Sequence, residues 1–406
     1  MLGSPQAAFP AIHVVGTDGK TSVARMITAL LHTAGVHAGE TTSPHLQHPG
    51  ERLRIGGRAI DDGALAVAGA ALHAAMPEVE RQVGQPATFF EAVTALALRT
   101  FADADVELAV VEAGIGGVGD ATNVVTSAVA VVTPIGLDHA ELGADLEAVA
   151  REKAAVVEPG GVLVVAPQPP QAAATVEAVA RERGARLVRI GDDAGVRWRR
   201  AGPDGQVASL RGLDGSTVQA WLPVIGAHQA VNAATALVAV QAFLGPQELD
   251  PSVAREGLAA VALPGRVELV RRPGEAEVVL DGAHDTLAVE ALVTALGERP
   301  PARQCVVVLG VGGGRDAARL VERLREVATT FVVTQAGSPT STPAADVAAR
   351  VVASGVEVIE TADVQGAMAV AQRLVGHGDR LIVTGSLHVV GAVRSLLAGA
   401  AAAEAA

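Results

Sequence analysis

The chain has 406 residues, half of them hydrophobic, and a formal net charge of −13 at pH 7. Since a single core rarely serves more than about 250 residues, this length predicts two domains. Aromatic residues make up only 2% of the chain and Tyr is absent, which argues against the stacking platforms that bind single-stranded nucleic acid. The negative charge would also repel a polyanion, so no nucleic-acid partner is expected.

Cysteine content and apolar runs bear on where the protein works. Cys305 is the only cysteine, which excludes an intramolecular disulfide and fits a reducing compartment. The sequence has neither a signal-peptide pattern nor an uncharged apolar run of about 18 residues. We therefore expect a cytoplasmic protein without a membrane partner.

The first part of the chain alternates short runs rich in Val and Ile with longer amphipathic stretches, which is typical of a parallel sheet covered by helices. Residues 11–16, AIHVVG, predict a buried strand, and residues 20–35 have helical spacing that ends at Gly35. Further strands are predicted at 106–114, 127–136 and 161–167. Their continuous apolarity indicates that both faces of the sheet are covered.

A change of pattern follows from about residue 196 to 223, where polar and apolar residues alternate between GPDG and LDG turns. This stretch predicts a small antiparallel sheet, and residues 227–244 predict a helix. Pro264 and Gly265 then stop one pattern before strand-then-helix units resume. We therefore expect a domain of residues 1–262 and a smaller α/β domain of residues 263–406.

The stretch GTDGKT at 16–21 is a candidate phosphate-binding loop, because a strand precedes it and a helix follows. Glycines let backbone N–H groups approach a phosphate, Lys20 can reach the β- and γ-oxygens, and the Thr21 hydroxyl can bind Mg²⁺. The strict motif would have glycine at position 14, where this chain has Val14. A chance turn before a helix is the alternative.

Polar residues at the ends of other predicted strands are candidate ligands. Glu112 ends an apolar strand, where α/β proteins bind ligands, and its carboxylate suits Mg²⁺; a solvated loop is the alternative. Asp138 and His139 follow another buried strand, so His139 is expected to meet Glu112, unless it is an ordinary packed histidine. Ser43 in TTSPHL has an ordinary surface loop as its favoured reading.

Other positions stay ambiguous from their local pattern alone. Lys153 lies on a predicted helix, where a solvated lysine paired with a glutamate is the favoured reading. Asp281 and His284 follow a strand of the second domain and have the same ambiguity as Asp138 and His139. No Cys/His set has zinc spacing, and no G-x-S-x-G motif is present.

Taken in order, these stretches resemble the folylpolyglutamate synthase/dihydrofolate synthase family, a branch of the Mur ligase superfamily. The resemblance implies a P-loop central domain with a mostly parallel sheet and a smaller Rossmann-like C-terminal domain. It also implies that ATP phosphorylates a substrate carboxylate and that the amine of L-glutamate then displaces phosphate. The matching stretches are FPAIHVVGTDGKTSVARM, TSPHLQHPGERLRIGG, TFFEAVTALALRTFA, VVEAGIGGVGDATN, IGLDHAELGADLEAVAREKAAV, GAHQAVNAATAL, LPGRVELV, VLDGAHDTLAVEAL and VTGSLHVVGAVR.

The resemblance also implies a role for each metal-site candidate. Thr21 or Ser22 would hold one Mg²⁺ together with Glu112, and Ser43 would lie at the same ion. His139 would help to hold a second Mg²⁺. Lys153 matches the lysine that the family carbamylates, which reverses the solvated reading.

On the nucleotide side, the resemblance implies a site between the two domains. Asn232 and His284 match adenine- and ribose-side residues, Arg266 matches a phosphate-contacting arginine, and Asp281 lies in the same pocket. Lys20 would contact the β- and γ-phosphates. The loop residues implied to surround the phosphates are Gly16, Thr17, Asp18, Gly19, Lys20, Thr21 and Ser22.

Three positions depart from the family pattern. Asp18 stands where the family has Asn, and we hypothesise that its carboxylate braces the loop through backbone N–H groups as Asn would. Thr21 replaces a glycine, makes the loop more like that of the cell-wall Mur ligases and restores the hydroxyl for Mg²⁺. Asp285 replaces an Asn, which leaves that one contact open.

We therefore predict an ATP- and Mg²⁺-dependent ligase that adds L-glutamate to tetrahydrofolate, with dihydropteroate as a second candidate acceptor. Its partners would be small molecules, a folate or pteroate acceptor and L-glutamate, and the family favours a monomer. Two alternatives stay open. One is a Mur-type ligase acting on a non-folate carboxylate, and the other is a nucleotide-binding regulator without turnover.

Overall fold

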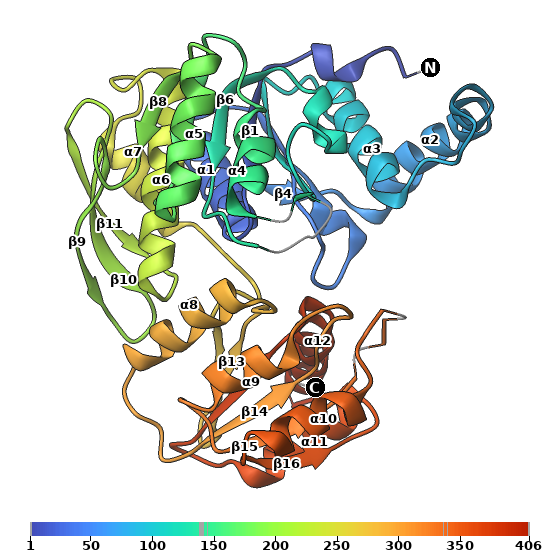
Figure 1. The fold of residues 1–406 in the computed structure, drawn as a ribbon, viewed down its shortest axis with the longest axis vertical. Helices are drawn as coiled ribbons and strands as arrows, with labels where there is room; N and C mark the ends of the chain where they lie inside the picture. The colour runs from blue at the N-terminus through green and yellow to red at the C-terminus, as the bar shows by residue number, and fades with distance from the viewer. Residues whose placement is uncertain (1, 138–141, 144, 336, 339, 405–406) are drawn as a thin grey trace. The chain divides into compact units, whose positions relative to one another are not determined.

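The computed structural model describes residues 2–137, 142–143, 145–335, 337–338 and 340–404. The chain forms two compact units (Figure 1), the first made of Met1–Arg200, Val207–Leu222 and Gln229–Val261. The second is made of Ala201–Gln206, Pro223–His228 and Ala262–Ala406. Among the described residues, no helix combines the length and the apolar character needed to span a membrane.

An eight-stranded sheet forms the centre of the first unit, in the order β4-β3-β2-β5-β1-β6-β7-β8. All pairs are parallel except those of β3 with β2 and with β4, which are antiparallel. The strands are β1 (Ala11–Val15), β2 (Ala38–Thr41), β3 (Leu53–Ile55), β4 (Arg58–Ala59), β5 (Leu108–Glu112), β6 (Ser127–Val132), β7 (Val162–Val165) and β8 (Arg186–Arg189). Every residue of β1 and β5 is buried, as their continuous apolarity predicts.

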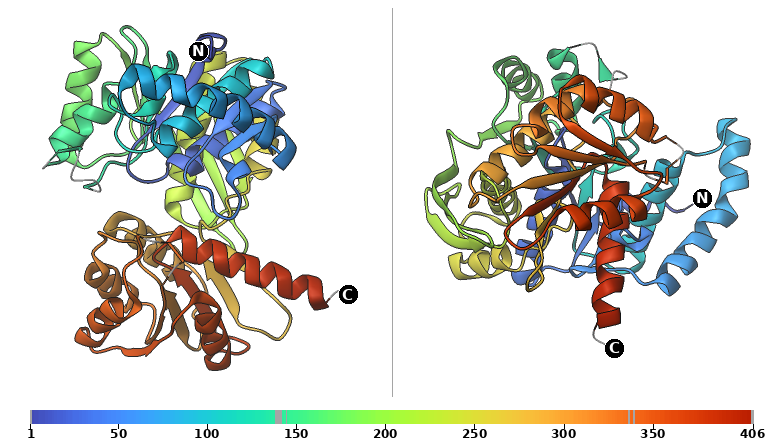
Figure 2. Two further views of the ribbon diagram at one scale, coloured as in Figure 1. Left: turned by 90° about the vertical axis from the view of Figure 1, so that its right-hand side faces the viewer. Right: turned by 90° about the horizontal axis from the view of Figure 1, so that it is seen from below.

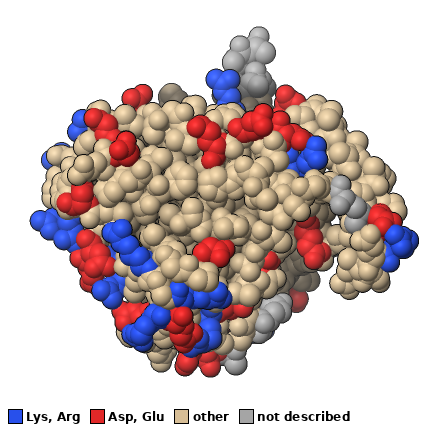
Figure 3. All heavy atoms as spheres, turned by 90° about the horizontal axis from the view of Figure 1, so that it is seen from above, with Lys and Arg blue, Asp and Glu red and all other residues tan. Residues whose placement is uncertain are grey.

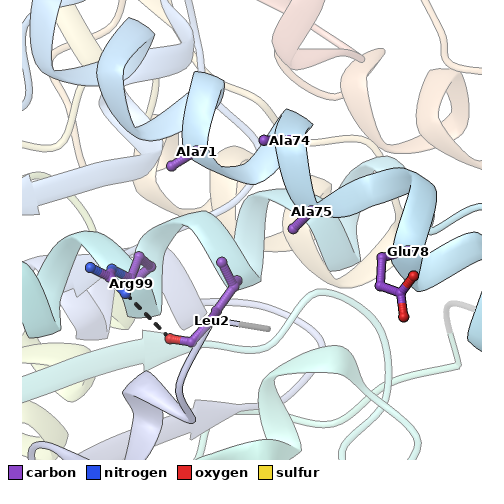
Figure 4. Close-up of a pocket in the computed structure, with 6 residues that line it drawn as sticks. All are labelled: Leu2, Ala71, Ala74, Ala75, Glu78 and Arg99. Carbon is purple, nitrogen blue, oxygen red and sulfur yellow. Dashed lines mark hydrogen bonds between the residues drawn. The ribbon is translucent and has the colours of Figure 1, made fainter.

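Helices complete the first unit. The α-helices are α1 (Lys20–Thr33), α2 (Asp62–Val83), α3 (Phe89–Asp103), α4 (Leu146–Ala154), α5 (Pro170–Glu182), α6 (Ala227–Leu244) and α7 (Pro251–Ala259). The 3₁₀ helices are Pro5–Ala7, Pro49–Arg52 and Ala121–Val124. Helix α2 packs on α3 and buries none of its residues fully. A pocket beside it is lined by Leu2, three alanines of α2, Glu78 and Arg99, whose Nη1 donates to the Leu2 carbonyl oxygen (Figure 4).

The stretch with alternating pattern forms a three-stranded sheet in the order β11-β10-β9. Its strands are β9 (Gly195–Ala201), β10 (Gln206–Arg211) and β11 (Thr217–Leu222). Exposed and buried residues alternate strictly along β11, and α7 packs against this strand and against α1. Both tryptophans of the chain, Trp198 and Trp221, lie on this sheet and are partly exposed.

The second unit is a six-stranded sheet in the order β12-β13-β17-β14-β15-β16, parallel except for the β12–β13 pair. One helix layer comprises α8, α9 and α10 and the other α11 and α12 (Figure 2). The strands are β12 (Glu268–Val270), β13 (Glu277–Leu280), β14 (Cys305–Leu309), β15 (Thr330–Val333), β16 (Glu357–Glu360) and β17 (Arg380–Thr384). The helices are α8 (Thr286–Gly297), α9 (Ala317–Leu324), α10 (Ala344–Ala353), α11 (Val364–Leu374) and α12 (Leu387–Glu404).

The predicted fold class is confirmed, because both units are built on mostly parallel sheets covered by helices. On the face drawn in Figure 3, acidic and basic side chains are interspersed around a broad uncharged area. In both sheets, polar residues singled out in the sequence lie at the carboxyl end of a buried parallel strand. Examples are Glu112 at the end of β5 and Asp281 directly after β13.

Candidate active site

The loop between β1 and α1 has the backbone shape of an anion cradle. Gly16 and Gly19 have φ of +142° and +83°, which L side chains rarely adopt. A Cβ at Gly16 would lie 1.9 Å from the Thr133 Oγ1, so only glycine fits there. Gly19 is the N-cap of α1, and the first N–H groups of the helix have no intrahelical acceptor. The loop therefore presents N–H donors and the positive end of the helix dipole to an anion.

The end of β6 holds this loop in place. The Thr17 N–H donates to the Pro134 carbonyl oxygen at 2.9 Å. The Thr17 hydroxyl donates to the Gly136 carbonyl oxygen and accepts from the Gly136 N–H, at 3.1 and 3.0 Å. The Asp18 N–H also donates to Pro134, while the bracing role of its half-buried carboxylate stays a prediction. Thr17 thus acts through loop structure in addition to any contact with phosphate.

Two lysine ammonium groups converge on the loop from different helices. Lys20 Nζ donates to the carbonyl oxygens of Gly16 and Thr17, at 3.0 and 2.8 Å. Lys153 Nζ, from α4, donates to the same Gly16 oxygen at 2.8 Å. Lys153 is 3% exposed, so the reading of a solvated lysine is wrong. The two Nζ atoms thus share the Gly16 carbonyl oxygen as an acceptor, which places both lysines at the phosphate loop.

Two of the predicted magnesium-site residues, Thr21 and Ser43, bond to Glu112 at the end of β5. Its carboxylate is buried and accepts the Thr21 hydroxyl at 2.9 and 3.0 Å and the Ser43 N–H at 3.1 Å. The strand register explains the meeting, since Val14 pairs with Glu112 just before the loop begins. A carboxylate and a hydroxyl are the hard oxygen donors that Mg²⁺ prefers, so these residues fit the ion.

The described residues contain no group of three or more His, Cys, Asp or Glu side chains placed to hold a metal. The set at Glu112 is therefore one carboxylate with the Thr21 hydroxyl, in keeping with the many waters and phosphate oxygens that Mg²⁺ retains. Asp138 and His139 lie outside the described residues. Their meeting with Glu112 and their part in a second ion stay predictions.

Of the two hydroxyls that the sequence left open, only Thr21 lies at Glu112. Ser22 Oγ accepts instead from Gln229 Nε2 at 3.4 Å, and Gln229 Oε1 accepts from Asn232 Nδ2 at 3.1 Å. All three side chains are buried, and a Cβ at Gly19 would lie 3.0 Å from Asn232 Oδ1. Helix α6 thus carries Asn232 beside the phosphate loop, with Gln229 as a polar link that the sequence analysis missed.

The glycine-rich loop after Glu112 is fastened to α4 by Glu152, the neighbour of Lys153. Its carboxylate accepts the N–H groups of Gly119 and Gly117, at 2.7 and 3.3 Å. A Cβ at Gly117 would lie 2.3 Å from the Glu152 carbonyl oxygen, so the close approach requires glycine. This fastening fixes the helix that places Lys153 at the phosphate loop.

A buried polar chain ties the same loop to β1. His13 Nε2 lies 2.9 Å from the Thr122 hydroxyl, which donates to Asp120 Oδ1 at 2.6 Å. Since the hydroxyl has one hydrogen, His13 must be protonated at Nε2 and donate it. Burial lowers the pKa of His13 to about 4, and Asp120 opposes the shift. The sequence signal for this residue was a histidine inside an otherwise apolar strand.

A further cation, Arg52, was not singled out in the sequence. It is buried, its guanidinium lies 5.2 Å from the centre of the Phe89 ring, and its Nε donates to His45 Nδ1 at 2.8 Å. Burial lowers the pKa of Arg52, and the charge of Glu112 opposes that shift. Arg52 therefore adds positive charge close enough to Glu112 to interact with its carboxylate.

The predicted residues of the second unit gather at the end of β13. Both Asp281 carboxylate oxygens accept backbone N–H groups, and burial raises the pKa of Asp281 against the opposing charge of Arg266. His284 Nδ1 lies 2.9 Å from the Gly282 carbonyl oxygen. Asp285 is the N-cap of α8 and accepts the Ala288 N–H at 2.9 Å. An Asn would make the same cap, so the departure at 285 leaves the helix start intact.

Comparisons with known proteins match both units. The Mur ligase middle domain matches residues 14–240, and the Mur ligase glutamate ligase domain matches residues 265–387. A dihydrofolate synthase/folylpolyglutamate synthase of Mycobacterium tuberculosis is 38% identical over 98% of this chain and 88% of its own. A folylpolyglutamate synthase of Lacticaseibacillus casei is 33% identical over 98% of this chain and 92% of its own.

Solved structures agree with the sequence matches. The structure of M. tuberculosis folylpolyglutamate synthase with ADP and AMPPCP has a TM-score of 0.92 and 37% identity, covering 97% of this chain and 92% of that one. A folylpolyglutamate synthase–AMPPCP–folate complex has a TM-score of 0.85 and 32% identity, covering 98% and 92%. The likeness therefore extends over nearly the whole chain.

Proposed function

The chain belongs to the folylpolyglutamate synthase/dihydrofolate synthase family of Mur ligases, and on that premise we propose that it joins L-glutamate to a folate in an ATP-dependent reaction. The observation that carries the proposal is the convergence of Lys20, Lys153, Thr21 and Glu112 on one loop. Relatives named for both activities make tetrahydrofolate and dihydropteroate the first acceptors to test.

In the first step, an oxygen of the acceptor carboxylate attacks the γ-phosphorus of ATP, and ADP leaves. Both reactants are anions, so charge must be neutralised before they approach. Lys20 and the N–H groups at the start of α1 supply positive charge at the phosphates. Mg²⁺ supplies more when bound, and Thr21 and Glu112 are the residues that would hold it, with Ser43 beside them.

In the second step, the amine of L-glutamate attacks the carbonyl carbon of the acyl phosphate, and inorganic phosphate leaves as the amide forms. Water competes for the same carbon, so the site must exclude it. We assign Arg266, Asn232 and His284 to the nucleotide side of this site.

We further propose that Lys153 is carbamylated and that His139 helps to hold a second Mg²⁺. A carbamate keeps one N–H on Nζ, so the bond from Lys153 to the Gly16 oxygen is compatible with the modification. It adds a carboxylate that can balance the charge of a metal ion. Division into an ATP-binding domain of residues 1–262 and a ligase domain of residues 263–406, a monomeric state and a cytoplasmic location complete the proposal.

The test is ATP-dependent phosphate release by the purified protein with L-glutamate and one acceptor at a time, followed by the masses of the products. The acceptors are tetrahydrofolate, dihydropteroate, a UDP-muramyl acid and none. A glutamyl mass increase on either pterin supports the proposal. Nucleotide binding without turnover on either pterin would refute the folate assignment and favour a Mur-type ligase for another acid, or a regulator.

A further inference from the structure

Val267 has a backbone conformation that is unusual for its side chain. Its φ is +50°, in the left-handed region, and the residue is 3% exposed. A β-branched residue is a marked outlier there, because its Cβ crowds the backbone. Such a conformer persists only when the surroundings hold it, since it is otherwise disfavoured by about tenfold or more. Outliers of this kind cluster at functional sites.

Asp281 supplies the contact that holds Val267. Its Oδ2 accepts the Val267 N–H at 2.8 Å, and its Oδ1 accepts the Ala283 N–H at 2.8 Å. The residue is only 8% exposed. Because each oxygen is already used by the backbone of this unit, the side chain is built into the loop rather than displayed on its surface.

Arg266 directly precedes Val267 and packs in the same loop. It lies between Gly265, with φ of +67°, and the left-handed Val267. Its Nη1 donates to the Gly265 carbonyl oxygen at 3.1 Å and lies against Gly282, where a Cβ would be only 2.9 Å away. The Gly282 N–H in turn donates to the Gly265 oxygen at 3.0 Å. Hydrogen bonds thus join the segments 263–268 and 281–285 beside the Arg266 guanidinium.

We propose that Asp281 is a positioning residue that holds Val267 in its left-handed conformation and thereby aims the Arg266 guanidinium. The proposal rests on the proposed function, in which Arg266 contacts the nucleotide phosphates. This role adds to the predicted contact of Asp281 with the nucleotide, because each carboxylate oxygen keeps a second lone pair that can accept a hydrogen bond.

A double-mutant cycle separates the two roles. Asp281→Ala leaves the Val267 N–H without its acceptor, so the backbone at 267 relaxes and the guanidinium turns away. We expect kcat/KM for ATP to fall about tenfold or more. In the Arg266→Ala background, the same substitution should cost at least about threefold less, because the group it positions is gone. An Asp281→Ala loss of the same size in both backgrounds would overturn the proposal and leave direct contact as the role of Asp281.

Glycine at position 267 gives an independent readout. Val267→Gly adopts φ of +50° without strain, so adding it to Asp281→Ala should recover about threefold or more of the lost kcat/KM. Asp363→Ala is the matched control, because it also removes a carboxylate that accepts a backbone N–H. Asp363 caps α11, which follows the edge strand β16 in the chain, and accepts the Gly366 N–H. It should leave kcat/KM unchanged. The absence of any recovery at 267 would count against the brace.

Hydrogen–deuterium exchange of the peptide covering residues 263–270 tests the brace without any turnover. Exchange should be slow in the unsubstituted protein and in Asp363→Ala, and faster in Asp281→Ala. Equal exchange in Asp281→Ala would overturn the proposal whatever the kinetics show. A protein with no ligase activity would instead refute the proposed function, while the exchange result would still decide whether Asp281 holds the loop.

Discussion

Lowering the pH from 7.5 to 5.0 is expected to remove stability from the first unit through His13, which the fold keeps neutral. Burial lowers the pKa of this histidine from its ordinary 6.5 to about 4, and the nearby Asp120 offsets only part of the shift. In the unfolded chain the imidazole takes up a proton as the pH falls through 6.5. Protonation therefore favours unfolding, and the stability present above pH 6.5 is lost as the pH falls toward 4.

The magnitude follows from the two pKa values. Because pH 5 lies about 1.5 below the unfolded value and about 1 above the folded one, linkage gives a loss of about 2 kcal/mol. The same relation gives a loss below about 0.1 kcal/mol at pH 7.5 and a limit of about 3 kcal/mol in stronger acid. A loss of this size is a large part of the stability of a typical domain.

Urea unfolding, monitored by tryptophan fluorescence, measures this loss of stability in the first unit. Trp198 and Trp221, the chain's two tryptophans, both belong to the first unit, which also contains His13. The control is His13→Gln, whose amide can donate to the Thr122 hydroxyl but does not titrate. The difference between the two proteins in their loss from pH 7.5 to 5.0 isolates His13, because the carboxylates titrate alike in both.

An equal loss of stability in the unsubstituted protein and in His13→Gln would refute the reasoning. It would mean that the imidazole is protonated in the folded chain near its ordinary pKa. The buried chain from His13 through Thr122 to Asp120 would then have to accommodate a charge, and the neutral form with its proton on Nε2 would be wrong.

Three further predictions concern the site and the second unit. In Lys153→Ala, the Kd for ATP should stay within about threefold of that of the unsubstituted protein, while the rate of ligation should fall by about 100-fold. A short carboxylate such as acetate should restore part of that rate. Full activity without added carboxylate would remove Lys153 from the mechanism. Asp18→Asn should leave the calorimetric Kd for ATP within about twofold, because an amide oxygen can replace the carboxylate as an acceptor; clearly tighter binding would mean that the carboxylate faces the γ-phosphate. Glu277→Ala should destabilise the second unit by about 3 kcal/mol in calorimetry, because it leaves three arginines without their shared, largely buried carboxylate; a loss below about 1 kcal/mol would show that solvent screens the group. The three arginines are Arg271, Arg299 and Arg380.

The local pattern of the sequence was sufficient for the fold class and for the positions of the polar strand ends. A buried parallel strand needs a continuous apolar run, and the polar residue that stops the run lies at the sheet edge where ligands bind. Glu112 was found in this way. The phosphate loop was found from its glycines and Lys20 between a predicted strand and a predicted helix, and Gly16 and Gly19 have backbone conformations that few other residues adopt.

Which of these groups meet was decided by the tertiary structure. Thr21 and Ser22 are neighbours with similar side chains, yet one bonds Glu112 and the other Gln229, because helix α6 packs beside the loop. Lys153 reads as solvated on its own helix and becomes buried only where that helix packs at the loop. Such meetings join residues far apart in the chain, so no short window of sequence contains them.

The same limit applies to groups that work inside the structure. His13 and Asp281 are single polar residues in or after apolar strands, and their local patterns do not distinguish a ligand from a support. Their roles depend on what the fold places opposite them, the Thr122 hydroxyl in one case and the left-handed Val267 N–H in the other. The sequence placed His13 inside a predicted buried strand and Asp281 directly after one. Tertiary packing decided which groups each of them bonds, because burial obliges a polar group to bond to whatever lies beside it.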